Sequence, residues 1–434
     1  MYLFYSLILT VAFVILSPLF LLQREKYLPG FRQRLGKHDR DLSDTRPVIW
    51  LHCVSVGETN AARPLFRQMA GAFPSHQFVI STTTRTGQQL ARDIYGDRAT
   101  VIYFPFDWKF TVKRALRHFR PSVVLLMETE IWPRFIKEAN ECGAKIAIVN
   151  GRLSERSKDR YLKVRPFIQD VLKNIDRLLM QADNDAERMV ALGAASENVT
   201  VTGNLKFDID ANEVDRELIE SLDHRFGLSG SLTIIAASTH APEESFILKA
   251  FSELKLRYPA RRLRLVLAPR HPERFDEVFE LAEKYDAAAR RSSAAGEHDK
   301  AAGVIILDSI GELRSVFNLG DIVFVGGSLI PHGGQSMLEP AAAGKAIVIG
   351  PHTFNFKDAV DRFTQAGAIV RLLEADTDQS YVEALTNELA HLIENKKARD
   401  EIAANARSVM LANRGATERT MAELKQLIDP APAK

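Results

Sequence analysis

Short apolar runs alternate with polar, amphipathic stretches along most of the chain, and this alternation predicts strands joined by helices. The run at 48–56 is mostly apolar and stops at Gly57, and the run at 121–127 stops at Glu128. Such runs are typical of strands buried on both faces of a parallel sheet. Further strands are predicted at 77–81, 100–104, 145–150, 177–181, 199–202, 232–237, 263–268, 304–307, 322–325, 346–350 and 368–371.

The alternation starts again after a polar, helical stretch at 212–231, which plausibly links two domains. Because strands alternating with helices build doubly wound parallel sheets, the pattern predicts an α/β protein with two similar units of about 180 residues each. Two such units are expected to enclose a cleft. The predicted parts are an anchor with a basic interfacial segment at 1–45, an N-terminal domain at 46–211, and a C-terminal domain with terminal helices at 212–434.

The N-terminal stretch at 2–23 carries no charged residue. As a helix, about 22 residues would cover about 33 Å, which is enough for the hydrocarbon core of a bilayer. The basic residues that follow are Arg24, Lys26, Arg32, Arg34 and Lys37. This excess places the C-terminal side in the cytoplasm. The sequence therefore predicts a single membrane anchor, although Pro18 leaves open a helix that dips into the membrane without spanning it.

Charge is divided unevenly between the two halves of the chain. Residues 1–210 carry 30 Lys and Arg against 22 Asp and Glu, whereas the remainder carries 27 against 33. A basic N-terminal half suits an acidic membrane surface or an anionic substrate, and scattered solvated charges explain it equally well. Cys53 and Cys142 fall in segments predicted to be buried, so they are expected to be reduced core thiols and not a disulfide or a metal pair.

Two acidic residues directly follow predicted strands of the first unit. Glu58 comes after the strand and Gly57, where a helix is expected to begin, and Glu128 ends the run at 121–127. The carboxyl ends of parallel strands share one edge of a sheet, so both side chains are expected at the same edge. Backbone N–H groups and the helix dipole there favour an ionised carboxylate, which is what a general base requires. An ordinary acidic residue in the first turn of a helix explains Glu58 as well.

Glycine-rich turns follow strands of the second unit, at 326–328 and 333–334. Their N–H groups can approach an anion closely, and a helix expected to begin near Gln335 would point its positive end at a phosphate. Arg270 suits the same phosphate, and Glu339 suits the two hydroxyls of a ribose. Together these residues predict a nucleotide mono- or diphosphate site, although each glycine alone marks no more than a tight turn.

The absence of some well-known motifs weakens competing interpretations of the function. The sequence has no Walker loop and no GxGxxG, which disfavours ATP and dinucleotides. Lys206 follows a strand and could supply positive charge to a leaving group or a carboxylate, although a solvated surface lysine is the alternative. Trp132 could form an apolar wall beside a sugar or lipid, although core packing is the alternative. No metal-ligand spacing relates the following histidines to one another: His52, His240, His271, His332 and His352.

Nine motifs, in order along nearly the whole chain, resemble the 3-deoxy-D-manno-octulosonic acid (Kdo) transferases of lipopolysaccharide synthesis. The motifs are SVGET (55–59), METEIWP (127–133), NGRLS (150–154), TGNLKFD (202–208), STHAPEE (238–244), PRHPERF (269–275), FVGGS (324–328), GGQSMLEP (333–340) and GPHTFNFKD (350–358). At Ser336, many members of that family have asparagine.

The resemblance implies a glycosyltransferase B-type fold with two Rossmann-like domains that face a cleft. It implies transfer of Kdo from CMP-Kdo to a lipid A precursor at the cytoplasmic face of the bacterial inner membrane, with no cofactor, no metal and no nucleic acid partner. The family's general base falls on Glu58, and its transition-state-stabilising positions fall on Glu128 and Lys206. Its CMP contacts fall on Pro269, Arg270, Ile310, Gly311, Glu312, Ser336, Met337, Leu338 and Glu339.

Two other functions remain open from the residues alone. One is a different nucleotide-sugar transferase or epimerase of the same fold. The other is a membrane protein that binds a nucleotide sugar without catalysis.

Overall fold

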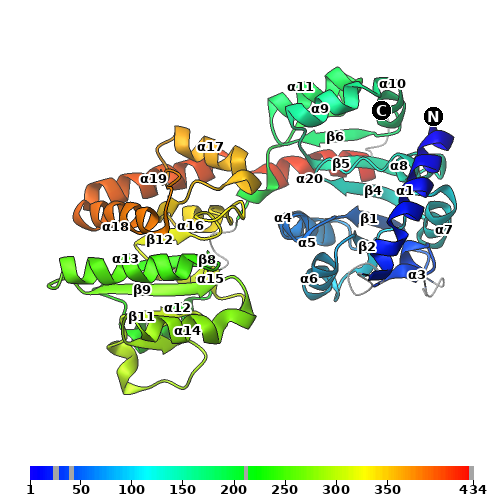
Figure 1. Cartoon of the computed structure of the whole chain (residues 1–434). Coiled ribbons are helices and arrows are strands. Elements are labelled where there is room, and N and C mark those ends of the chain that lie inside the picture. The colour runs from blue at the N-terminus through cyan, green and yellow to red at the C-terminus, as the bar shows by residue number, and fades with distance from the viewer. Residues whose placement is uncertain (23–28, 39–43, 210–213, 430–434) are drawn as a thin grey trace. The chain divides into compact units, whose positions relative to one another are not determined.

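The computed structural model describes residues 1–22, 29–38, 44–209 and 214–429. The chain forms two compact units: the first contains Met1–Asp208 and the segment that begins at Asn413, and the second contains Ile209–Ala412. Figure 1 shows a strand-and-helix unit of α/β type in each case.

Seven parallel strands form the sheet of the first unit, in the order β3-β2-β1-β4-β5-β6-β7. The strands are β1 Val48–His52, β2 Gln77–Thr82, β3 Thr100–Tyr103, β4 Pro121–Met127, β5 Lys145–Gly151, β6 Arg177–Met180 and β7 Val199–Val201. The strand order reverses between β1 and β4, which pair in parallel with His52 opposite Leu126. This is the doubly wound topology predicted for this unit, and the predicted strand at 48–56 ends earlier, at His52.

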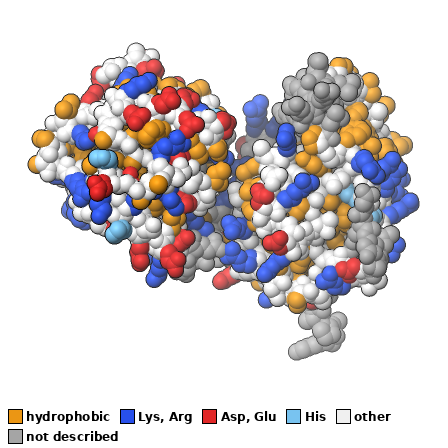
Figure 2. Space-filling model, turned by 90° about the horizontal axis from the view of Figure 1, so that it is seen from below, with side chains coloured by type: hydrophobic (Ala, Val, Ile, Leu, Met, Phe, Trp, Pro, Cys, Tyr) orange, Lys and Arg blue, Asp and Glu red, His pale blue; other side chains and the backbone are white. Residues whose placement is uncertain are grey.

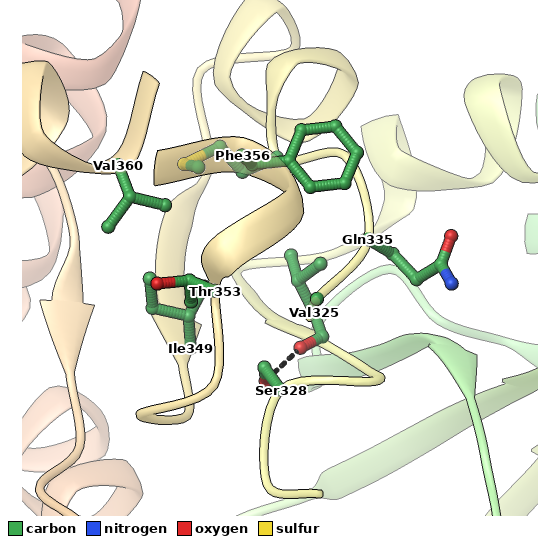
Figure 3. Close-up of a pocket in the computed structure, with 9 residues that line it drawn as sticks. Val325, Ser328, Gln335, Ile349, Thr353, Phe356 and Val360 are labelled. Carbon is green, nitrogen blue, oxygen red and sulfur yellow. Dashed lines mark hydrogen bonds between the residues drawn. The ribbon is translucent and has the colours of Figure 1, made fainter. Parts of the chain in front are cut away.

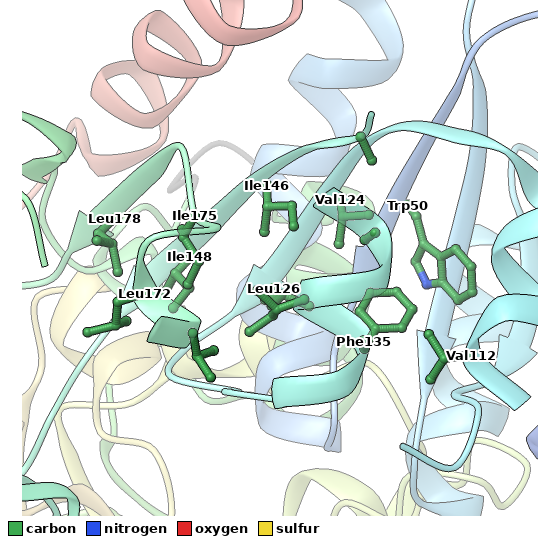
Figure 4. Close-up of a cluster of buried hydrophobic side chains, with 14 of the residues drawn as sticks. Trp50, Val112, Val124, Leu126, Phe135, Ile146, Ile148, Leu172, Ile175 and Leu178 are labelled. Carbon is green, nitrogen blue, oxygen red and sulfur yellow. The ribbon is translucent and has the colours of Figure 1, made fainter. Parts of the chain in front are cut away.

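Helices cover both faces of this sheet. They are α1 Tyr2–Leu22, α3 Phe31–Arg34, α4 Val56–Ala61, α5 Arg63–Ala72, α6 Arg85–Tyr95, α7 Lys109–Phe119, α8 Pro133–Glu141, α9 Glu155–Leu162, α10 Arg165–Leu172, α11 Asp183–Leu192 and α20 Ala416–Ile428, with short 3₁₀ turns η1 Ser196–Asn198 and η2 Leu205–Phe207. Successive residues of β1 point to opposite faces and enter different apolar clusters. Trp50 packs with Phe135 of α8 (Figure 4), whereas Leu51 packs with residues of α5 and α20 on the other face.

The C-terminal helix α20 belongs to the first unit, although 212–434 were predicted to form one domain. Its buried residues Met421 and Leu424 join the apolar cluster of β1 and α5. Asp208 fixes the start of this helix, because its carboxylate accepts the N–H groups of Gly415 at 2.7 Å and Thr417 at 2.5 Å. The helix pattern at the end of the chain predicted the helix, but nothing in it indicates which unit buries the apolar face.

Seven parallel strands also form the sheet of the second unit, in the order β10-β11-β9-β8-β12-β13-β14. The strands are β8 Leu232–Thr239, β9 Leu263–Pro269, β10 Ala288–Arg290, β11 Val304–Ile306, β12 Ile322–Val325, β13 Ala346–Ile349 and β14 Val370–Arg371. The order reverses between β8 and β12. Strand β10 was not predicted, because a run of alanines and arginines carries no apolar strand signal.

The helices of the second unit are α12 Arg216–Phe226, α13 Glu243–Arg257, α14 Phe275–Glu283, α15 Leu313–Val316, α16 Leu338–Ala342, α17 Lys357–Gln365, α18 Asp378–Glu394 and α19 Lys396–Ala412, with 3₁₀ turns η3 Pro272–Arg274, η4 Glu297–Lys300, η5 Phe317–Leu319 and η6 Phe354–Phe356. One face of the sheet is covered by an apolar cluster that includes Phe251 of α13, Val278 of α14 and Leu385 of α18. On the face drawn in Figure 2, Lys and Arg side chains are prominent on the first unit, and Asp and Glu form several patches on the second.

Helix α1 covers most of the predicted anchor. Within the described ranges, no helix combines the length and the apolar composition that crossing a bilayer requires. Arg24 and Lys26 of the predicted basic segment lie outside the described residues, as does the predicted domain boundary at 211–212.

Candidate active site

The first candidate site lies where the strand order of the first sheet reverses. In doubly wound sheets the crevice outside the carboxyl ends of the two strands at this point is where ligands bind. Glu58 follows β1, and Glu128 directly follows β4. The structure therefore places both predicted carboxylates beside this reversal.

Local sequence determines how Glu58 is held. Ser55 has extended backbone and caps α4, and its hydroxyl faces the Glu58 N–H at 3.5 Å. In return, the Glu58 carboxylate accepts the Ser55 hydroxyl at 2.9 Å and the Val54 N–H at 2.7 Å. The side chain is folded back onto the loop after β1 and is 6% exposed.

Burial, more than the helix terminus, sets the ionisation of Glu58. Desolvation raises the pKa of this carboxyl to about 7, the Val54 N–H opposes the rise, and the neighbouring Glu128 adds to it. The amides and the dipole were expected to favour the ionised form, and the Val54 N–H does so, but burial outweighs it. A carboxyl with a pKa near neutral pH is nevertheless well matched to general base catalysis.

Glu128 forms ion pairs with two cations. Its Oε1 lies 2.7 Å from Lys206 Nζ, and its Oε2 lies 2.8 Å from Arg152 Nε. The backbone of Glu128 has φ +52°, in the left-handed region that non-glycine residues rarely adopt. Strain of this kind clusters at functional strand ends.

Lys206 is positioned by the end of the neighbouring strand β5. The side chain of Asn150 accepts the N–H of Leu205 at 2.9 Å and so fixes η2, the turn that carries Lys206. Like Glu128, Asn150 has left-handed backbone, with φ +56°. Sequence reasoning selected Glu128 and Lys206 but not Arg152. The NGRLS motif, which places an arginine directly after a predicted strand, was the available signal.

Aromatic rings line the same edge of the sheet. The buried His52 ring stacks on Phe104 at 3.8 Å between centroids, and Trp132 lies 5.4 Å from Phe104. Burial lowers the pKa of His52 to about 3, so this imidazole is neutral. Trp132 is partly buried and packs on the core, which leaves the predicted apolar wall and the core role both in place.

The residues predicted to contact a nucleotide lie at the carboxyl edge of the second sheet. Pro269 ends β9, Arg270 follows it, and residues 310–312 follow β11. Ile310 is 82% exposed, and Glu312 pairs with Arg291 at 2.9 Å. Because β11, β9, β8 and β12 are successive neighbours, these residues share one edge with residues 336–339.

The glycine-rich turn after β12 does not offer its amides to a ligand. Glu243, which is fully buried at the start of α13, accepts the N–H groups of Gly327 at 2.7 Å, Ser328 at 2.9 Å and Leu329 at 2.9 Å. It also accepts the N–H of His240 at 3.0 Å. The prediction that the amides at 326–328 approach an anionic ligand is therefore wrong, because Glu243 holds those of Gly327 and Ser328, and the Gly326 N–H donates to the Ala237 carbonyl at 2.8 Å.

The helix expected near Gln335 begins later, as α16, Leu338–Ala342. Ser336 and Glu339 are half-buried, whereas Met337 and Leu338 are buried. Burial raises the pKa of Glu339. A small pocket beneath this segment is lined by Val325, Ser328, Ile349, Thr353 and Val360, and the Gln335 amide points away from these side chains (Figure 3).

The cysteines conform only partly to expectation. Cys53 is buried and free, whereas Cys142 is exposed and not in the core as predicted, because it lies just past the end of α8. In the part of the chain that the structure describes, no group of three or more His, Cys, Asp or Glu residues is arranged to hold a metal ion.

Two parallel seven-stranded sheets of this topology define a two-domain Rossmann-like α/β fold of the glycosyltransferase B and epimerase type. Solved structures with the same fold include a UDP-GlcNAc 2-epimerase from Neisseria meningitidis, at a TM-score of 0.58, 13% identity, and coverage of 88% of this chain and 100% of that chain. A glycosyltransferase from Rickettsia africae matches at a TM-score of 0.55, 13% identity, and coverage of 89% and 100%.

The chain belongs to the 3-deoxy-D-manno-octulosonic acid transferase family. The family described as 3-Deoxy-D-manno-octulosonic-acid transferase (kdotransferase) matches residues 29–209. The 3-deoxy-D-manno-octulosonic acid transferase of Haemophilus influenzae is 33% identical over 405 residues, which is 92% of this chain and 93% of the relative. That of Bordetella pertussis is 33% identical over 385 residues, or 87% and 86%. The predicted family is thereby confirmed.

The raised pKa of Glu58 predicts a pH-dependent stability that its amide variant lacks. The folded pKa of about 7 lies above the unfolded value, so the native state binds this proton more tightly and loses stability as pH rises from about 4.5 to 7. The free energy of unfolding of wild type relative to Glu58→Gln should fall by about 1–3 kcal/mol over that window and stay level above it. Urea denaturation at pH 5, 6, 7 and 8 measures this, with exposed Glu141→Gln as the matched control; a difference that is constant with pH would show that Glu58 ionises normally.

Proposed function

We propose that the chain transfers Kdo from CMP-Kdo to a lipid A precursor in lipopolysaccharide inner-core synthesis, as an inverting glycosyltransferase. The observation that carries this proposal is that two different carboxyl groups lie at the strand reversal of the first sheet. Glu58 is buried and has a pKa of about 7, and Glu128 forms an ion pair with Lys206. Family membership over most of the chain supports the same activity.

Glu58 is the proposed general base. Its carboxylate takes the proton of the acceptor hydroxyl while that oxygen forms a bond to the anomeric carbon of Kdo. The bond from this carbon to the phosphate oxygen breaks, and CMP leaves with the electron pair. A single displacement of this kind inverts the anomeric configuration.

Glu128 and Lys206 are the proposed stabilising groups. The Glu128 carboxylate suits positive charge that develops on the sugar ring, and Lys206 and Arg152 hold that carboxylate in place through ion pairs. Because Lys206 Nζ is engaged with Glu128, we assign it to this carboxylate and leave the departing phosphate to Arg270 of the second unit.

The second unit is the proposed donor side. Pro269, Arg270, residues 310–312 and residues 336–339 share one sheet edge, where a cytidine, its ribose and its phosphate would be held. Glu339 suits the ribose hydroxyls. The Arg270 guanidinium has no ion-pair partner among the described residues and suits a phosphate. Basic residues of the first unit would meet the phosphates of the acceptor.

The transfer itself is tested by mass spectrometry of the product. Purified full-length protein, CMP-Kdo and a tetraacyl lipid A precursor should yield an acceptor heavier by one or more Kdo residues, and UDP-sugars should yield none. Glu58→Gln should lower the rate about 10²- to 10⁴-fold, because proton transfer is lost. Glu141→Gln should behave as wild type. Product from UDP-sugars instead of CMP-Kdo would assign a different transferase, and a near-normal rate for Glu58→Gln would remove the base.

We further propose that the outward face of α1 lies in the cytoplasmic leaflet of the inner membrane. One face of the helix is fixed to the first unit, since Tyr5 donates to Asp107 at 2.8 Å and Phe13 packs on Trp108 at 4.9 Å. The opposite face carries exposed apolar residues at helical spacing. These residues are Leu3, Phe4, Leu7, Ile8, Val11, Val14, Ile15 and Leu16. An apolar face of this size next to a basic unit suits an anionic lipid surface.

Vesicle flotation tests the membrane contact. Wild type should float with vesicles that contain anionic phospholipid, and Leu7→Asp with Ile15→Asp should reduce the floating fraction about tenfold, because two charges enter the apolar face. Leu256→Asp, at an apolar residue of α13 that is more exposed than either Leu7 or Ile15, is the control and should float as wild type. Equal flotation of the double variant would exclude this face as the lipid contact.

A further inference from the structure

Three imidazoles gather at the strand reversal of the second sheet, and none has a role so far. His240 follows β8, His271 follows β9, and His332 follows β12. The ring centroids of His240 and His332 are 4.2 Å apart, and those of His240 and His271 are 5.1 Å apart.

Glycine at position 327 permits this approach. Its backbone has φ +66°, and a Cβ there would lie 3.3 Å from His332 Cδ2 and 3.4 Å from His240 Cδ2. The same residue gives its N–H to Glu243, which also accepts the N–H of His240. Glu243 therefore ties the loop of His240 to the loop that leads to His332.

The cluster has few negative charges to balance protonated rings. The Glu243 carboxylate accepts four backbone N–H groups, and Glu244 and Glu277 form ion pairs with Arg274, so these carboxylates are already engaged. His271 Nδ1 lies 3.6 Å from Glu273 at the exposed edge. No carboxylate among the described residues pairs with Arg270 or with the ring of His240.

We propose that His240, His271 and His332, with Arg270, bind an oxyanion of the donor and that His240 takes up a proton when it binds. This rests on the proposed function, since CMP-Kdo carries both a phosphate and a carboxylate. The amides of the glycine-rich turn are filled by Glu243, so the imidazole cluster supplies the positive charge that those amides cannot.

The free protein keeps His240 neutral. Gln335 Nε2 lies 3.2 Å from His240 Nε2, and an amide N–H donates, so His240 Nε2 accepts and its proton is on Nδ1. Burial, followed by the charges of His332, His271, Arg270 and Arg274, lowers the pKa of His240 to about 4. No described residue accepts a hydrogen bond from His240 Nδ1, which leaves that N–H for a ligand.

An anion reverses the balance of charges around His240. It favours the protonated ring, so the pKa rises in the complex and binding absorbs protons at pH values between the free and bound pKa. Affinity should therefore increase as pH falls through that window. The titratable and charged groups that face His240 are His271, His332, Arg270 and Arg274, and Gln335 must turn its amide oxygen toward the charged ring.

Isothermal titration calorimetry in buffers of different ionisation heat measures the protons absorbed. The full-length protein is titrated at pH 6 and 8 with CMP, cytidine and free Kdo. CMP carries a phosphate that itself titrates near pH 6, so the quantity of interest is wild type minus His240→Gln with the same ligand. His332→Gln is the second variant, and His391→Gln, at an exposed residue of α18, is the matched control.

At pH 6 wild type should absorb more protons on binding CMP than His240→Gln does, and the variant should bind CMP about tenfold more weakly; at pH 8 the two should be alike. His332→Gln should reduce both effects, and His391→Gln should change neither. Proton uptake with CMP but not with cytidine would show that the cluster binds the phosphate. Proton uptake with Kdo alone would show that it binds the carboxylate. Equal proton uptake by wild type and both cluster variants, with every anion, would overturn the proposal.

The outcome is separable from that of the transfer assay. If the protein makes Kdo-lipid product while wild type and variants absorb equal protons, the activity stands and the imidazole site falls. If no product forms and His240-dependent uptake with CMP remains, the site stands and the activity falls.

Discussion

The constraint on which the structure depends is the burial of carboxyl groups at the carboxyl ends of parallel strands. The first sheet places two such groups after the strands at its point of reversal, Glu58 and Glu128, and the second sheet places Glu243 there. Removing a carboxylate from water is unfavourable unless donors replace the water. The three groups differ in the donors that they find.

Glu243 accepts four backbone N–H groups and so ties the loops after β8 and β12, although burial still raises its pKa. Glu58 finds one backbone N–H and one hydroxyl, so its desolvation is only partly offset and its pKa stays near 7. Glu128 is the third case, in which two cations and not amides hold the charge. One architecture thus yields a structural carboxylate, a proton acceptor and an ion-paired carboxylate.

Much of the fold could be predicted because parallel strands are continuous apolar runs with clear ends. The run 121–127 matches β4 at both ends, and Glu58 and Glu128 could be placed at one edge before any coordinates were known. Strand β10 could not be predicted, because Ala288–Arg290 lacks the continuous apolar pattern of a strand. It is a strand through its pairing with β11. The assignment of α20 to the first unit also depends on tertiary packing, because an amphipathic pattern does not identify its partner.

The errors at the sites have a common physical origin. Sequence shows that a glycine-rich turn follows β12 but not which group accepts its amides, and Glu243, which accepts those of Gly327 and Ser328, lies over 80 residues earlier in the chain. Likewise, the helix start at Glu58 was visible, whereas the depth of its burial was not. Proximity of His240 to His332 required the strand order, since the two residues are far apart in sequence.

The most direct test of a Glu58 poised by burial is the pH dependence of the single-turnover rate of Kdo transfer with both substrates saturating. If the buried carboxyl accepts the proton, the rate should rise about tenfold per pH unit up to about pH 7 and level off above it. A rate that stays level down to pH 5 would show that the accepting group ionises as an ordinary carboxyl, and would contradict this role for Glu58.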